Sequence, residues 1–105
     1  MEKYLINFKN IEWESPMPGF RYKAYIKNNK KIRLVEFSNG FFEKEWCTSG
    51  HIGYILKGTI IINFSGKRII FSEGDGIFIS EGEKHKHKAE IMQGEKALIV
   101  LVEKI

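Results

Sequence analysis

Five side chains of types that bind metals lie in two short segments of the sequence. They include every histidine and cysteine of the 105-residue chain: Glu45, Cys47, His51, His85 and His87. Neutral imidazole, thiolate and carboxylate groups all bind divalent transition metals. The sequence therefore suggests a metal site, provided that the fold brings residues 45–51 next to residues 85–87.

The segment that contains the last two histidines reads GEKHKHK and allows two interpretations. If it continues as a strand, alternation places His85 and His87 on one face and the three lysines on the other. Two imidazoles on one strand face are a natural pair of metal ligands. The alternative is an exposed strand end on which histidine and lysine are simply solvated. The segment alone leaves both interpretations open.

Strands are expected along most of the chain, because no segment shows a sustained 3.6-residue apolar period. Residues 20–27, FRYKAYIK, alternate between apolar and polar, and later segments are rich in Ile, Val and Phe, which suit a pleated sheet. Turn-forming dipeptides such as Asn39-Gly40 and Ser65-Gly66 separate these segments at short intervals. We expect about nine to eleven strands in an all-β sandwich or barrel.

The start of the chain differs in character. It contains both prolines, Pro16 and Pro18, which belong at sheet edges and turns. We predict an N-terminal arm over residues 1–19, with an edge strand from Tyr4 to Phe8 and an irregular segment laid against the barrel. Because the chain has no linker or internal repeat, residues 1–105 are expected to form a single domain.

Composition argues against several classes of protein. The single cysteine excludes an internal disulfide, which favours a reducing compartment. The longest apolar run, residues 97–102, is far shorter than the roughly 20 residues of a membrane span, and residues 1–10 lack the apolar core of a signal peptide. The net charge of +4 comes from interspersed basic and acidic residues rather than a basic patch. We expect a soluble, cytoplasmic protein that binds neither nucleic acid nor a membrane.

The segment GDGIFISEGEKHKHKA resembles the second conserved motif of the cupin superfamily. Gly74 and Gly82 stand at the two glycines of that motif, and His85 stands at its metal-binding histidine. Ser80 replaces the usual proline and Ala89 replaces the usual asparagine.

The first cupin motif is matched in its spacing rather than in its residue types. Counting back from Gly58, His51 stands at the glutamate of the motif, and Cys47 and Glu45 stand at its two histidines. The replacements are themselves competent ligands. The resemblance therefore implies a metal site with these ligands: His51, His85, His87, Cys47 and Glu45. The implied cofactor is a divalent transition metal: Zn, Ni, Fe, Mn or Cu.

The resemblance covers roughly residues 30–103. The sequence is similar in particular to small, single-domain bacterial cupins. It implies a double-stranded β-helix, or jelly-roll, barrel with a short N-terminal arm, and it implies a homodimer. One expected function is a barrel that binds a divalent metal and a small molecule, with isomerase, decarboxylase or dioxygenase chemistry open to it. The alternative is a metal-free small-ligand-binding or sensor module without catalysis. No residue outside the ligand set is marked as a catalytic base.

Two aromatic residues, Trp46 and Tyr54, are candidate contacts to a small molecule. Trp46 lies between two of the candidate ligands. Small-molecule sites are usually lined by aromatic side chains with a few polar groups. Most of the other aromatic residues are expected to pack in the core.

Overall fold

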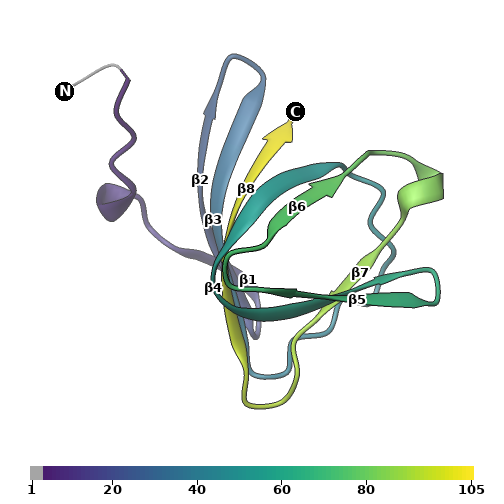
Figure 1. The fold of residues 1–105 in the computed structure, drawn as a ribbon. Helices are drawn as coiled ribbons and strands as arrows, with labels where there is room; N and C mark the ends of the chain where they lie inside the picture. Colours follow the sequence, from purple (N-terminus) through teal and green to yellow (C-terminus); the bar gives the residue numbers. More distant parts are fainter. Residues whose placement is uncertain (1–3) are drawn as a thin grey trace.

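The computed structural model describes residues 4–105, which form a curled antiparallel β-sheet (Figure 1). The all-β prediction is confirmed. The strands are β1 (Glu14–Met17), β2 (Phe20–Lys27), β3 (Lys30–Ser38), β4 (His51–Phe64), β5 (Lys67–Ser72), β6 (Gly76–Ile79), β7 (Lys88–Glu90) and β8 (Lys96–Lys104). Two short 3-10 helices are η1 (Phe8–Asn10) and η2 (Glu83–His85). The described residues hold fewer strands than the sequence predicted, because two of the expected strands join in β4.

Strand β4 is 14 residues long and takes part in two sheets. Its first half pairs with β6 and β8, and its second half pairs with β5 and β7. Between the halves, an extra residue at Leu56 interrupts the pairing with β8 and forms a β-bulge. A bulge bends its strand and shifts the alternation by one residue. Thus His51 and Ile55 face the interior before the bulge, whereas Ile60 and Ile62 face it afterwards.

Two of the hairpins have two-residue turns with positive φ at both positions. Asn28-Asn29 joins β2 to β3 with φ of 52° and 62°, and Ser65-Gly66 joins β4 to β5 with φ of 57° and 105°. Such turns match the twist of the strands that they connect. Asn39-Gly40 also has positive φ, but it ends β3 and leads into a loop, residues 41–50, rather than separating two paired strands as predicted.

The inner faces of the strands form the hydrophobic core. The most deeply buried side chains are those of Val35, Ile55, Ile60 and Ile99. On β8, every second residue is buried, namely Ala97, Ile99 and Leu101. The next residue in this alternation is Glu103, so the same pleat that buries the apolar residues places a carboxylate on the inner side of the sheet.

The described part of the N-terminal arm, residues 4–19, lies at the β2 edge of the sheet (Figure 1). The predicted edge strand from Tyr4 to Phe8 is wrong, because the edge strand is β1, which contains Pro16. Proline is tolerated there because an edge strand leaves one row of N–H groups unpaired. Cation–π contacts hold the arm, since Arg21 and Lys23 lie 4.1 Å and 5.0 Å from the ring centre of Trp13. Within residues 4–105, no helix has the length and apolar character required to span a membrane.

Candidate metal centre

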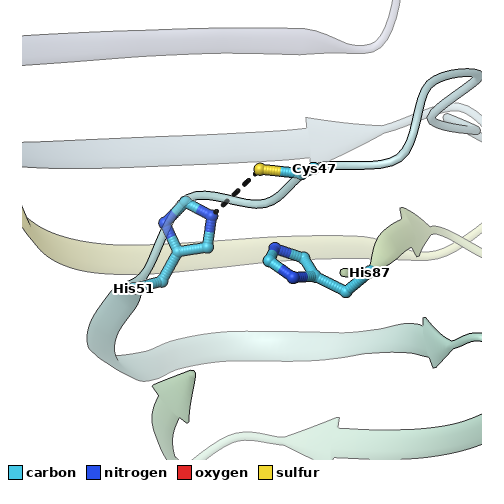
Figure 2. Close-up of side chains that lie close together, drawn as sticks. All are labelled: Cys47, His51 and His87. Atoms are coloured by element: carbon cyan, nitrogen blue, oxygen red, sulfur yellow. Dashed lines mark hydrogen bonds between the residues drawn. The ribbon is translucent and has the colours of Figure 1, made fainter. Parts of the chain in front are cut away.

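Backbone pairing places Cys47, in the loop before β4, opposite His87, just before β7. The N–H of Cys47 donates to the carbonyl of His87 at 2.9 Å, and the N–H of His87 donates to the carbonyl of Cys47 at 3.0 Å. Residues paired in this way in antiparallel strands project their side chains to the same face. The two side chains therefore lie close together although 40 residues separate them in the sequence (Figure 2).

His51 begins β4 and approaches the same place from a second direction. Its Nε2 atom lies 3.7 Å from the Sγ atom of Cys47, the contact drawn as a dashed line in Figure 2. Its Nδ1 atom lies 2.7 Å from Oε2 of Glu103, on β8. Glu103 also accepts two hydrogen bonds from Arg33, at 2.8 and 2.6 Å. Because Nδ1–H donates to this carboxylate, Nε2 is the nitrogen that faces Cys47, and it can bind a metal once it has lost its proton.

His87 is arranged in the same way by a backbone carbonyl. Its Nδ1 atom donates to the carbonyl of His85 at 2.9 Å, which leaves the lone pair of Nε2 on the other side of the neutral ring. The side chain is buried, and Nε2 is the one buried side-chain nitrogen or oxygen in residues 4–105 with no hydrogen-bond partner. The rings of His51 and His87 meet edge to face, with centres 5.1 Å apart.

The three side chains together match a metal-binding set. Cys47, His51 and His87 each offer one ligand atom, and these atoms all lie within 4.8 Å of one another. Ligand atoms around a tetrahedral zinc ion lie about 3.5 Å apart, given its usual bond lengths. One sulfur and two ring nitrogens, each nitrogen held by a hydrogen bond on its far side, therefore fit a divalent transition metal.

Close packing shifts the pKa values within this group. Contacts with His51 and His87 lower the pKa of Cys47 to about 5. Burial lowers the pKa of His51, but hydrogen bonds with Cys47 and Glu103 outweigh burial and raise it to about 9. Burial raises the pKa of Glu103, but hydrogen bonds with His51 and Arg33 outweigh that effect and lower it to about 2. At neutral pH the sulfur is therefore a thiolate, which is the form that binds metals.

The group lines a cavity of about 620 Å³ inside the barrel. Most of the wall is apolar and includes Phe20, Phe37, Phe41, Ile60, Ile62, Ile77, Ile99 and Leu101. A second hollow, of about 670 Å³, shares Cys47 and His51 with the first but has a more polar wall that includes Ser49, Ser80 and Glu81. His87 lines only the first, so the apolar cavity is the one that all three candidate ligands face.

His85 and Glu45 lie apart from the three-residue group. His85 is exposed in η2, and β7 begins only at Lys88, so the strand face that His85 and His87 were expected to share is not formed. That expectation of the local structure was wrong. His85 instead supplies the carbonyl that orients His87. Glu45 is exposed at the rim of the cavity. Metal binding by the side chain of either residue stays a prediction.

The two aromatic residues expected to contact a small molecule line neither hollow. The ring of Trp46 packs beneath Lys86 and Lys88, whose ammonium groups lie 5.4 Å and 4.7 Å from its centre. Tyr54 lies on the outer face of β4 and is 48% exposed. Their contact with a small molecule stays a prediction.

Two acidic residues of the site were missed at the sequence level, Glu103 and Glu43. Glu103 could have been found, because it continues the alternation of buried residues on β8, and a charged residue on a core face needs a partner. Glu43 shares the parity of Phe41 and Cys47 in an extended loop and lines the cavity. Only the three-dimensional position of that loop distinguishes it from a surface glutamate.

The fold is similar to those of several solved structures at low sequence identity. An RmlC-like cupin from Shewanella frigidimarina superposes with a TM-score of 0.79 at 13% identity, covering 98% of this chain and 91% of that one. KdgF from a Halomonas species gives 0.76 at 19%, covering 100% and 96%. The polyketide cyclase RemF from Streptomyces resistomycificus gives 0.80 at 18%, covering 99% and 80%. These likenesses support the predicted jelly-roll barrel, which is confirmed.

The sequence itself carries a family match. The profile of the cupin domain matches residues 44–102, which is more than half of the chain and includes Cys47, His51 and His87. Comparison with curated protein sequences finds no match. The profile match and the fold agree with the resemblance seen in the two sequence motifs, and the chain belongs to the cupin domain family.

Proposed function

We propose that Cys47, His51 and His87 hold a divalent transition metal at the wall of the apolar cavity, where a small molecule binds. The observation that carries this proposal is the Nε2 atom of His87, which is buried without a hydrogen-bond partner. Buried nitrogen atoms are nearly always paired, and an orphan suggests an ion that belongs there. A metal ion is the partner that would also use the thiolate of Cys47 and the Nε2 of His51.

The ligand types narrow the choice of metal. A thiolate with two imidazoles favours zinc, copper or iron over manganese, which prefers oxygen ligands. Three protein ligands leave a coordination position open, as in catalytic rather than structural zinc sites. Zn²⁺ is therefore the metal that we expect first, within the wider group predicted from the sequence.

The residues around the site have identifiable roles under this proposal. Cys47, His51 and His87 would hold the metal, which would supply Lewis-acid chemistry at a substrate oxygen, as in metal-dependent isomerases, decarboxylases or dioxygenases. Glu103 and the carbonyl of His85 hold the two imidazoles in the tautomer that can bind the metal. The aliphatic and aromatic wall removes water from around a bound molecule, which strengthens every polar contact made there.

The alternative function is a metal-free module that binds a small ligand without catalysis. The size and apolar wall of the cavity favour it independently of the metal group, since apolar pockets of this volume commonly bind small molecules. Metal content separates the two functions.

Formation of a homodimer and location in the cytoplasm stay predictions.

The test is metal analysis of the purified chain, supplied with Zn²⁺ and then freed of loosely bound metal by gel filtration. We expect about one zinc per chain in the wild type and loss of zinc in H51A, H87A and C47S. H85A tests whether these three ligands suffice, because it removes the exposed imidazole of His85 and keeps the carbonyl that orients His87, and zinc should then be retained. A wild type without stoichiometric metal, or an H87A variant that keeps it, contradicts the proposal.

A further inference from the structure

The part of the cavity wall away from the metal group contains three clustered phenylalanines. The ring centres of Phe20 and Phe37 lie 5.3 Å apart in a stacked arrangement, and Phe41 lies 5.7 Å and 5.0 Å from them. All three line the cavity. Phe20 and Phe37 are only partly buried although they point inward, so part of their ring surface faces the cavity. Apolar ring surface exposed inside a cavity is stabilised when another apolar group covers it.

Glu43 places one acidic group in this otherwise apolar wall. Its N–H donates to the carbonyl of Ala89 at 3.0 Å, and its Oε1 accepts from the N–H of Ala89 at 2.8 Å, so both backbone and side chain are held. Within residues 4–105, no donor contacts the second oxygen, Oε2. Burial, the largest influence, raises the pKa of this carboxyl. Glu43 is partly buried, and a ligand that donates a hydrogen bond to this oxygen would stabilise it.

Among residues 4–105, no arginine or lysine in the interior of the cavity lacks an anionic partner. Arg33, on the wall, donates to both oxygens of Glu103. Lys44 is exposed at the rim. A phosphate or carboxylate ligand would therefore lose its hydration without a charged partner, apart from a metal. The wall instead fits a ligand that is largely apolar and carries few polar groups.

We propose that the ligand of this cavity is a compact aromatic molecule with a hydroxyl group, whose ring packs against Phe20, Phe37 and Phe41 and whose hydroxyl donates to Glu43. The volume of about 620 Å³ accommodates a fused two-ring molecule. This inference rests on the proposed function only in taking the cavity as the ligand site. It requires no metal and adds the chemical class of the ligand.

Two probes of nearly the same shape test the proposal: 1-naphthol, which has a hydroxyl donor, and 1-methoxynaphthalene, which has none. Calorimetry on the purified chain should show that 1-naphthol binds at least about tenfold more tightly, the difference expected for a hydrogen bond to a charged acceptor. E43Q should abolish this preference, because the amide oxygen must pair with Ala89 and its NH₂ group then faces the cavity. E36Q is the matched control away from the cavity and should keep the preference.

F37A should weaken both probes to a similar degree, since it removes ring surface and leaves Glu43 in place. Its thermal unfolding is measured in parallel, and F37L serves if F37A does not fold. The proposal is overturned if neither probe binds the wild type, or if the preference for 1-naphthol persists in E43Q. Zinc uptake and probe binding are measured on the same preparation, which separates the two proposals. A protein that takes up no zinc refutes the metal site, and if that protein still binds 1-naphthol with the expected preference, the proposed ligand class stands.

Discussion

The Nδ1 atom of His51 and the Oε2 atom of Glu103 lie 2.7 Å apart, although 52 residues separate them in the sequence. The contact exists because β4 and β8 pair in antiparallel register, with Ile52 opposite Val102. It positions the imidazole and determines which nitrogen faces Cys47 and His87. Glu103 is therefore a positioning residue, one step removed from the proposed metal.

Replacing Glu103 by glutamine should lower the affinity for Zn²⁺ by about 10- to 100-fold, the usual effect of losing a carboxylate that orients a histidine ligand. Competition with a chelating dye measures the change. E36Q is the matched control, because Glu36 also pairs with an arginine, Arg21, but lies away from the cavity. An E103Q variant that is folded and binds zinc as tightly as the wild type contradicts the assigned role.

Zinc affinity should increase with pH over the neutral range. A protonated imidazole cannot bind a metal, and the raised pKa of His51, about 9, means that protons compete for this ligand throughout that range. Cys47, with a pKa of about 5, is already a thiolate and adds little to the dependence. We expect affinity to rise by at least about tenfold for each pH unit between about pH 6 and pH 8, because His51 releases one proton and His87, whose pKa is also raised, adds to the dependence. Dissociation constants at three pH values check this, and a flat profile would show that His51 is not a ligand.

Acid should destabilise the wild type more than E103Q. Glu103 has a pKa of about 2 in the folded chain against an ordinary value of 4.5, so the unfolded chain binds more protons between these values. The stabilisation is fully present above about pH 4.5 and is lost as the pH falls toward 2, and it amounts to at most about 3 kcal/mol. Urea unfolding of metal-free protein near pH 6 and pH 3 measures it. Equal losses in the two proteins would contradict the prediction, and E36Q should follow the wild type.

Alanine at Gly58 should destabilise the barrel far more than alanine at Gly66. Both glycines have positive φ, of +80° and +105°, so either substitution strains the backbone by about 1 to 2 kcal/mol. At Gly58, next to the bulge in β4, a Cβ atom would also overlap the carbonyl of Lys96, whereas at Gly66 it meets no atom within 4 Å. We expect a loss above about 3 kcal/mol for G58A. Urea unfolding compares the variants, and similar losses would indicate that β8 adjusts to the added methyl group.

Local sequence patterns correctly predicted one hairpin turn and one complete strand. Ser65-Gly66 forms the predicted two-residue hairpin turn, and FRYKAYIK forms β2, with Phe20 and Tyr22 against the core. The predictions failed where tertiary contacts override local preference. β4 spans two segments that were predicted as separate strands, because a bulge bends the strand so that it pairs in both sheets. The segment from Tyr4 to Phe8, where an edge strand was expected, does not form a strand, and β1 pairs with β2 instead.

Among the candidate ligands, alternation by itself treats His85 and His87 alike. The chain turns through η2 before β7, so only His87 reaches the barrel interior, where it pairs with Cys47. A short 3-10 turn has no strong sequence signal, and its side chains do not follow the two-residue alternation of a strand. Glu43 was missed for a related reason, since it meets Ala89 only where the loop of residues 41–50 lies beside β7.

The sequence by itself determined the class of fold, the family and the chemical types of the available ligands, because these depend on composition, periodicity and motif spacing. The tertiary structure decided which of those ligands converge. The pairing of Cys47 with His87 and the start of β4 at His51 bring these three residues together and leave His85 and Glu45 outside that group. Register is set by packing over the whole barrel, and a shift of one residue reverses the facing of every side chain in a strand. No local stretch of sequence contains that information.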